Sequence, residues 1–439
     1  MKTIKKAYFV GIGGISMCAL ARILQSFGTQ VFGSDIDKVQ LEKLSKSGFC
    51  VYFGHNKNNV KGDIDLLVYS SSIAPDNPEI LKAKELGIKI CNRGELLGLI
   101  AKQYKNVIAV SGAHGKTTTT SMIFEIFKTA KLNPTAHIGG IVRSENSNVV
   151  LGGKKYFITE ACEFKDNFLY LCPTVGVVTN IEAEHMDYFK TTKRLKQSFA
   201  KFVSNCQYVV AKKKIVCKNK ILIGKTGFHS QNYILCDDGC YKFDLMYKQK
   251  KLFDVKLKII GEYNVENAVF ACAVAKHFGI KDIFIKTALE NFEGVQRRFD
   301  IIRREPMIIH DYAHHPSELK AVINAVKPWT KGKLIVVFQP HTYTRTLSLM
   351  TGFYQSFCCC DELLILKTYS AREKEILGGR AIDLYQNLKK RLSSKIYYFD
   401  RFEDCKKFLD KKIKKQDKIL FLGAGNIEIL AKCYKQNEN

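Results

Sequence analysis

The sequence lacks any long run of apolar residues. No stretch of its 439 residues approaches the roughly 18 consecutive apolar residues that a membrane helix requires. The segment Met1–Lys6 runs directly into an expected strand without a cleavable apolar segment. We therefore expect no membrane insertion and a cytoplasmic location, while the 46% hydrophobic content favours globular folding throughout.

Paired cysteines are also missing. The 15 cysteines are dispersed, odd in number and without C-x-x-C spacing, and the closest approaches to a pattern are Cys236 with Cys240 and the run Cys358–Cys360. This usage favours reduced thiols in the protein core over a zinc site or a disulfide framework.

Acidic residues are scarce relative to basic ones. The chain has 69 Lys and Arg against 42 Asp and Glu, a formal net charge of +27 that favours polyanionic partners, nucleotides included. The lysines are nevertheless spread along the whole chain, with local runs at 212–214 and 411–415, and no nucleic-acid recognition module accompanies them. We expect a solvated, lysine-rich surface and no nucleic-acid partner.

One glycine is missing from a phosphate-binding pattern. The apolar run Val107–Val110 leads into Gly112–Thr117 (Gly-Ala-His-Gly-Lys-Thr), whereas the full Walker pattern requires a glycine in place of Val110. We expect a buried strand, a tight turn and a helix over 118–128. Backbone N–H groups at such a helix start bind phosphate oxygens, Lys116 reaches the outer phosphates and the Thr117 hydroxyl ligates Mg²⁺. A glycine-rich turn without a ligand is the alternative.

A second glycine-rich turn lies near the N-terminus. A strand over 7–10 precedes Gly11–Gly14, and a strand over 30–33 ends near Asp35, close to the interval at which a dinucleotide fold presents an acid to a ribose. Ser16 occupies the third glycine position of that fingerprint. Nicotinamide binding, nucleotide-sugar binding and a purely structural turn remain open. Hydroxyls at 70–72, after a further strand, could contact a diphosphate.

Polar side chains follow the strands of the central part. A strand over 156–159 is followed by Glu160, and a strand over 175–180 is followed by Glu184, His185 and Asp187. Because the C-terminal ends of parallel strands meet at one edge of a sheet, we expect these side chains beside Thr117. Hard oxygen ligands suit Mg²⁺, and a set of exposed loop acids is the alternative.

The remaining candidates lie in the second half of the chain. Asn264 and Asn267 stand one turn apart on an expected helix, where they either cap it or contact a purine. The paired Arg297 and Arg298 can close on a phosphate. Polar clusters follow three expected strands, at 310–316, 339–346 and 423–426. Three such strand ends favour a binding site at the C-terminal edge of a parallel sheet over three unrelated loops.

These motifs occur in the order typical of one enzyme family. The chain resembles the Mur ligases over nearly its whole length, through Gly11–Ile15, Gly112–Thr117, Thr179–Glu182 with His185, Asn264–Ala268, Arg297–Phe299, Asp311–Pro316 and Phe338–His341. The first and the last two motifs are similar to the branch that joins L-alanine to UDP-N-acetylmuramate.

The resemblance implies an α/β fold of three domains. A Rossmann-like domain over 1–103 would bind UDP-N-acetylmuramate, a central P-loop ATPase-type domain over 104–296 would bind ATP, and a Rossmann-like domain over 297–439 would bring the amino acid. ATP with Mg²⁺ would phosphorylate the lactyl carboxylate, and the amine of L-alanine would attack the acyl phosphate, giving UDP-MurNAc-L-Ala, ADP and phosphate for peptidoglycan synthesis. A monomer or weak homodimer is implied.

The resemblance also implies roles for the matching residues. The ATP-binding residues would be Gly112, Ala113, His114, Gly115, Lys116, Thr117, Thr118, Asn264, Asn267, Arg298 and Asp311. The residues that bind the UDP-sugar or alanine would be Gly11, Gly13, Gly14, Ser71, His314 and Arg345. The metal ligands would be Thr117, Glu160 and His185. The residues that act directly in catalysis would be Lys116, His114, Arg298, His314 and Arg345.

The chain departs from the family pattern at a few positions. They are Ala113 for a usual Thr, Ser16 for a Gly, Glu262-Tyr263 for a Lys-His pair, Thr342 for a second Arg and Asn426 for a frequent Asp. Three rival functions remain at this point. They are a sister ligase that joins a tripeptide, a nicotinamide-dependent oxidoreductase built on 11–35, and a nucleotide-binding regulator without catalysis.

Overall fold

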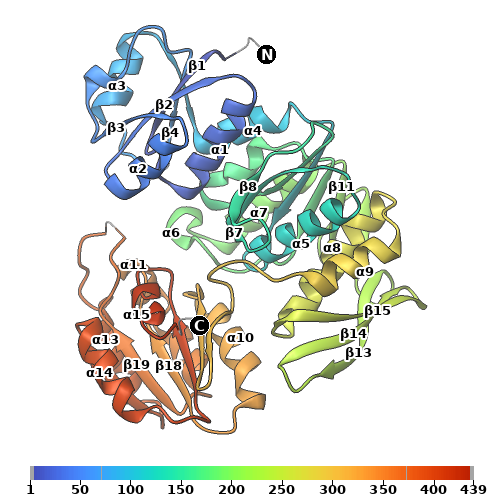
Figure 1. Cartoon of the computed structure of the whole chain (residues 1–439), viewed down its shortest axis with the longest axis vertical. Coiled ribbons are helices and arrows are strands. Elements are labelled where there is room, and N and C mark those ends of the chain that lie inside the picture. Colours follow the sequence, from blue (N-terminus) through green and yellow to red (C-terminus); the bar gives the residue numbers. More distant parts are fainter. Residues whose placement is uncertain (1–3, 71, 372, 436–439) are drawn as a thin grey trace. The chain divides into compact units, whose positions relative to one another are not determined.

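The computed structural model, which describes residues 4–70, 72–371 and 373–435, contains three mainly parallel sheets (Figure 1). The chain forms two compact units. Unit 1 comprises Met1–Gln231, Asp244–Val255 and Glu266–Phe292, and unit 2 comprises Asn232–Phe243, Lys256–Val265 and Glu293–Asn439. The predicted α/β fold class is confirmed.

The first sheet of unit 1 is parallel and has the order β3-β2-β1-β4-β5. Its strands are β1 (Lys6–Val10), β2 (Gln30–Asp35), β3 (Cys50–Phe53), β4 (Leu66–Tyr69) and β5 (Lys89–Asn92). Its helices are α1 (Ile15–Ser26), α2 (Lys38–Lys46), α3 (Pro78–Glu85) and α4 (Arg93–Ala101). Buried side chains alternate along β1, so that Phe9 packs with α1 and α4 while Tyr8 packs with α3 on the other face.

A second sheet has the order β15-β14-β13-β12-β11-β10-β6-β9-β7-β8. The strands are β6 (Asn106–Ser111), β7 (Thr135–Val142), β8 (Ser147–Val150), β9 (Tyr156–Glu160), β10 (Val175–Val178), β11 (Tyr208–Lys212), β12 (Lys220–Ile223), β13 (Phe228–Leu235), β14 (Cys240–Tyr247) and β15 (Lys250–Ile260). The helices are α5 (Lys116–Thr129), α6 (Met186–Phe189), α7 (Thr192–Ser204), α8 (Tyr263–His277) and α9 (Asp282–Asn291). Strand β6 lies between β9 and β10 and is parallel to both, so their C-terminal ends meet.

The sheet of unit 2 has the order β16-β17-β21-β18-β19-β20, with only β16 antiparallel to its neighbour. The strands are β16 (Asp300–Arg304), β17 (Met307–Asp311), β18 (Leu334–Phe338), β19 (Glu362–Leu366), β20 (Lys395–Phe399) and β21 (Lys418–Leu422). The helices are α10 (Pro316–Val326), α11 (Tyr343–Ser348), α12 (Met350–Phe357), α13 (Ala381–Lys389), α14 (Phe402–Lys412) and α15 (Glu428–Lys432). Helices α10, α12 and α13 pack on one face, and α14 and α15 pack on the other.

Two expectations from composition can be compared with the structure. No helix among the described residues combines the length and apolarity that crossing a bilayer requires. The prediction of core thiols holds for Cys91, Cys240, Cys272, Cys360 and Cys405, which are buried. It is wrong for Cys50, Cys172, Cys358, Cys359 and Cys433, which are exposed, because they lie in loops, at a helix end or on an edge strand rather than on core-facing positions.

Candidate functional site

The turn between β6 and α5 requires glycine at two positions. Gly112 has φ +134° and Gly115 has φ +81°, a left-handed region that residues with a side chain rarely adopt. A Cβ on Gly112 would lie 2.1 Å from Thr179 Oγ1, and one on Gly115 would lie 2.5 Å from Asn267 Oδ1. The predicted phosphate-binding turn is therefore present, and α5 begins at Lys116, two residues earlier than expected.

The end of β10 holds this turn in place. His114 N donates to Asn180 Oδ1 over 3.0 Å, while Thr179 Oγ1 and Asn180 Nδ2 donate to His114 O over 2.7 and 3.1 Å. The half-buried His114 ring approaches Glu182, with Nε2 3.2 Å from Oε2. The loop conformation is thus fixed by the protein itself, as preorganised anion binding requires.

Lys116 is held by oxygen atoms on several sides. Its Nζ donates to Gly112 O, to Ala113 O over 3.2 Å and to Glu163 Oε1 over 3.1 Å. Burial acts to lower the pKa of Lys116, but the carboxylates of Glu163 and Glu184 outweigh it and raise the pKa. The side chain therefore stays cationic at the mouth of the loop.

Two carboxylates and an imidazole converge beside Lys116. Ligand atoms of Glu163, Glu184 and His185 all lie within 4.8 Å of one another. Glu163 is only 1% exposed, and among the described residues nothing donates a hydrogen bond to its Oε2. Such a buried, under-coordinated oxygen fits a hard divalent cation such as Mg²⁺.

The predicted metal ligands are only partly brought together. His185 belongs to this cluster, and Thr117 is buried in the first turn of α5. Glu160 instead accepts a hydrogen bond from Gly139 N over 2.6 Å. Sequence reasoning gave no role to Glu163, although its position three residues after Glu160 at the same strand end was a usable signal.

The two predicted adenine-binding asparagines make different contacts. Asn264 is 3% exposed and donates from Nδ2 to Ile260 O over 2.8 Å. Asn267 accepts at Oδ1 from Thr119 Oγ1 over 3.2 Å. Asn267 thereby adjoins the turn between β6 and α5, whereas Asn264 contacts the end of β15 rather than capping α8, and contact with a purine stays a prediction for both.

The glycine-rich turn after β1 is held by an acid. Gly13 N donates to Asp35 Oδ2 over 2.8 Å, and a Cβ on Gly13 would lie 3.0 Å from that carboxylate. Asp35 Oδ1 accepts from Ile36 N over 2.8 Å. Gly11 has φ +81° and Gly14 precedes α1. Ser71 and the side chain of Asp187 lie outside the part of the chain that the structure describes.

A cluster of Ser16, His137 and Arg93 joins this turn to β7. Ser16 Oγ lies 2.9 Å from His137 Nε2 and accepts from Arg93 Nη1 over 3.3 Å. His137 Nδ1 lies 2.9 Å from Thr159 Oγ1. Burial, aided by the Arg93 charge, lowers the pKa of His137 to about 3. The serine that departs from the glycine fingerprint therefore makes one of the contacts between α1 and the second sheet, alongside the hydrogen bond from Asn148 Nδ2 to Ile15 O.

In unit 2, Asp311 and Arg298 flank the end of β17. Asp311 is 4% exposed and accepts from Phe299 N and Ala313 N, each over 2.7 Å. Burial raises the pKa of Asp311 to about 6, although Arg298 acts in the opposite direction. The Arg298 guanidinium lies 5.3 Å from the centre of the Tyr312 ring and 3.9 Å from Glu318.

His314 and Arg345 are held by neighbours that sequence reasoning did not select. His314 Nδ1 donates to Tyr312 O over 2.9 Å, and Arg345 Nη1 donates to His341 Nδ1 over 3.0 Å and to His341 O over 3.2 Å. The rings of His314 and His341 are 5.8 Å apart. His341 and Glu318 are thus missed site residues. His341 stands inside the polar cluster at 339–346, and Glu318 lies two residues beyond the cluster at 310–316, in the first turn of α10.

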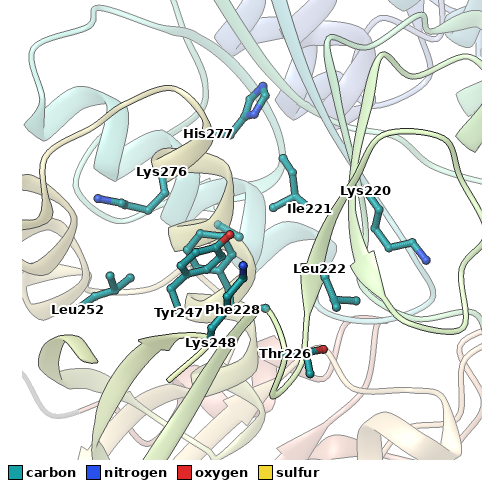
Figure 2. A pocket seen from close by; sticks show the side chains of 12 residues that line it. Lys220, Ile221, Leu222, Thr226, Phe228, Tyr247, Lys248, Leu252, Lys276 and His277 are labelled. Atoms are coloured by element: carbon teal, nitrogen blue, oxygen red, sulfur yellow. The ribbon is translucent and has the colours of Figure 1, made fainter. Parts of the chain in front are cut away.

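A separate pocket of about 510 Å³ lies in unit 1 (Figure 2). It is lined by β12, Phe228, Tyr247 and the C-terminal end of α8, and it holds none of the predicted site residues. Figure 2 shows the amines of Lys220 and Lys276 pointing away from one another, and Lys276 pairs with Asp282 over 2.9 Å. The pocket therefore gives no convergent charged site.

The chain matches three protein-family models in succession. Residues 6–105 match "Mur ligase family, catalytic domain", residues 110–275 match "Mur ligase middle domain" and residues 297–425 match "Mur ligase, glutamate ligase domain".

Individual proteins are similar over nearly the full length. The chain is 41% identical to a UDP-N-acetylmuramate–L-alanine ligase of Caldicellulosiruptor saccharolyticus, over 96% of each chain. It superimposes on the crystal structure of a UDP-N-acetylmuramate-alanine ligase of Thermotoga maritima with a TM-score of 0.82 and 27% identity, covering 98% of each chain. A murein peptide ligase of Psychrobacter arcticus shares the fold, with a TM-score of 0.69, 20% identity and 98% coverage of each chain.

Three histidines, of which His310 is buried and His314 and His341 are partly buried, make the stability of unit 2 depend on pH. Burial lowers the pKa of His310, His314 and His341 to about 4, 3 and 4. Unfolded histidines bind protons below about pH 6.5, so the stabilisation is present above that pH and is lost as the pH falls toward 4. Asp311, with its raised pKa, opposes this trend. We expect the free energy of unfolding of unit 2 to fall steeply between pH 6.5 and 4.5.

The measurement is urea unfolding followed by the fluorescence of Trp329, the single tryptophan, which lies in unit 2. The substitution His310→Gln removes one titrating group and should flatten the pH slope by about 1 kcal/mol per pH unit. Equal slopes for His310→Gln and the unsubstituted chain would contradict this assignment.

Proposed function

The chain belongs to the Mur ligase family, and from this premise we propose how its residues join L-alanine to UDP-N-acetylmuramate. The protein is an ATP-dependent amide-forming ligase of peptidoglycan precursor synthesis. Of the structural observations, the one that best supports the assignment of roles is Lys116, held at the phosphate-binding turn beside the cluster of Glu163, Glu184 and His185.

The chemistry explains why such a site is needed. A carboxylate is a poor electrophile, and ATP with Mg²⁺ supplies a phosphoryl group that turns the lactyl carboxylate into an acyl phosphate. The alanine amine then attacks the acyl carbon. A carbon–nitrogen bond forms, and the bond from that carbon to the phosphate oxygen breaks, so that phosphate leaves. The protein must neutralise phosphate charge and exclude water from the activated group.

In unit 1 we assign the phosphates to the turn after β6. Residues Gly112–Thr117 form this turn. Ala113 N and His114 N donate to Asn180, so the backbone N–H groups of Gly115, Lys116 and Thr117, together with the Lys116 amine, bind the phosphate oxygens, with Thr118 in the first turn of α5 behind them. The carboxylates of Glu163 and Glu184 and the imidazole of His185 suit the divalent cation, with the Thr117 hydroxyl on the phosphate side. Glu160 accepts one hydrogen bond from Gly139 N, and the lone pairs that remain on its carboxylate stay available to the cation in this proposal.

In unit 2 we assign the ATP ribose to Asp311, the γ-phosphate to Arg298 and alanine to His314 and Arg345. His314 is neutral at physiological pH, and its Nδ1–H is used by Tyr312 O, so Nε2 offers a lone pair to the alanine amine. Two hydrogen bonds to His341 fix the Arg345 guanidinium for the alanine carboxylate. His341 and Glu318 act as positioning residues.

The remaining assignments follow the family pattern. We propose that Gly11, Gly13, Gly14 and Ser71 line the UDP-sugar site, that Asn264 and Asn267 meet adenine and that His114 faces the reacting carboxylate. The proposed domain bounds are 1–103, 104–296 and 297–439. A cytoplasmic location and a monomer or weak homodimer complete the proposal.

Phosphate release tests the proposed function directly. We expect release with UDP-N-acetylmuramate, ATP and Mg²⁺ only when a small amino acid is added, with L-alanine preferred over glycine and L-serine. Lys116→Ala should lower kcat at least about 1,000-fold, because the ammonium group that stabilises the negative charge of the transferred phosphoryl group is removed. Release that responds only to the tripeptide would identify the sister ligase, and a fully active Lys116→Ala variant would remove the assigned role.

The Ser16, His137 and Arg93 cluster gives a prediction about substrate binding. Ser16→Ala removes the contact that orients the first turn of α1, next to the proposed UDP-sugar site. We expect KM for UDP-N-acetylmuramate to rise roughly tenfold, as loss of a hydrogen bond to a charged group implies, while kcat stays within about twofold. Ser16→Thr, which keeps the hydroxyl, is the matched control. Steady-state kinetics with an unchanged KM for Ser16→Ala would contradict the assignment.

A further inference from the structure

Two adjacent exposed cysteines follow α12. Cys358 and Cys359 both lie at the surface, and their Sγ atoms are 3.7 Å apart. The next residue, Cys360, is buried, and its thiol donates to Phe357 O over 3.1 Å. The triple-cysteine run therefore divides into one core thiol and a surface pair, which we name the Cys358–Cys359 pair.

The spacing of the pair matches two ligands on one ion. In a tetrahedral site with metal–sulfur bonds of about 2.3 Å, two sulfurs lie about 3.8 Å apart. The observed Sγ–Sγ separation of 3.7 Å matches this distance. Thiolates prefer soft, thiophilic centres, so the pair can chelate one such centre.

Binding of an ion requires both thiols to lose their protons. The hydrogen bond between Cys358 and Cys359 is the main cause that raises the pKa of Cys359, with partial burial adding to it, so the free pair retains its protons. Lys327 and Lys320 act in the opposite direction. A bound centre replaces the shared proton, and the two lysines then stabilise the thiolate charge.

Helix α12 connects the pair to the start of α10. Ser356, two residues before Cys358, is 3% exposed, and its Oγ donates to Pro316 O over 2.7 Å. A Cβ on Gly352, one turn earlier, would lie 3.0 Å from Pro316, so the two helices are in close contact.

The start of α10 in turn holds the proposed alanine site. Glu318, in the first turn of α10, accepts from His314 N over 3.2 Å. A shift of the last turn of α12 would therefore displace Pro316 and with it the segment that carries His314.

We propose that the Cys358–Cys359 pair chelates one thiophilic centre, either a soft divalent ion or a trivalent arsenical, and that loading it inhibits the ligase through α12 and α10. With an organoarsenic oxide, two thiol protons and the arsenic-bound oxygen leave as water while two arsenic–sulfur bonds form. With a divalent ion, two protons are released and no electron is transferred. The inhibitory half rests on the proposed function, and the chelation half does not.

Intact-mass measurement on the full chain, without substrates, tests chelation. We expect phenylarsine oxide to add one equivalent that survives excess monothiol and is removed by a dithiol. Cys358→Ser and Cys359→Ser should each lose this adduct, and Cys433→Ser, which removes another exposed thiol, should keep it. Retention of the dithiol-sensitive adduct in both Cys358→Ser and Cys359→Ser would overturn the site.

A second arm distinguishes the two kinds of centre. Cd²⁺ alone should produce a sulfur-to-cadmium charge-transfer absorption that disappears in Cys358→Ser, and Cd²⁺ loaded beforehand should block the arsenical adduct. Cadmium absorption that is unchanged in Cys358→Ser would restrict the site to arsenicals and overturn the claim for divalent ions.

The inhibitory half is read from phosphate release after loading with phenylarsine oxide. We expect activity to fall at least fivefold in the unsubstituted chain and in Cys433→Ser, to return with a dithiol, and to be unaffected in Cys359→Ser. An adduct of full stoichiometry with unchanged activity would overturn the coupling. Absence of any ligase activity before loading would instead count against the proposed function, so the two failures are distinguishable.

Discussion

One ion pair, between the partly buried Lys116 and the buried Glu163, holds the proposed phosphate and metal sites together. A lysine at the mouth of a tight turn is useful for phosphate chemistry only if it stays charged and stays in place. Glu163 and the carbonyls of the turn meet both conditions before any nucleotide binds. The same carboxylate keeps its second oxygen for a cation, so phosphate binding and metal binding share one residue. The parallel pairing of β6 with β9 and β10 brings these groups together.

Unit 1 holds its site lysine in the charged form, whereas the environment in unit 2 favours the neutral forms of its site residues. Loss of contact with water lowers the pKa of His314 and His341 and raises the pKa of Asp311, so the neutral forms are favoured. Neutral imidazoles accept hydrogen bonds from an amine or a guanidinium without repelling them. His314 and His341 serve the proposed alanine site in this way, at the cost of stability in acid.

Features that depend on the local order of residues, such as turns and strands, could be predicted from the sequence. Contacts between residues that are distant in the sequence could not. The turn at Gly112–Thr117 and the strands around it follow from apolar runs and glycine positions, and both were predicted correctly. The sequence places Glu163 close to Glu160 at the same strand end, but only the fold shows that Glu163 is the carboxylate that contacts Lys116. The contact of Ser16 with His137 spans 121 residues and has no local signal.

The central claim is that this site activates the lactyl carboxylate by phosphorylation. The most direct test uses UDP-N-acetylmuramate with oxygen-18 in both carboxylate oxygens, together with unlabelled ATP and L-alanine. If an acyl phosphate forms, one labelled oxygen leaves with each phosphate, and mass spectrometry of the released phosphate should detect it in every turnover. Unlabelled phosphate together with full formation of the alanine amide would contradict the account.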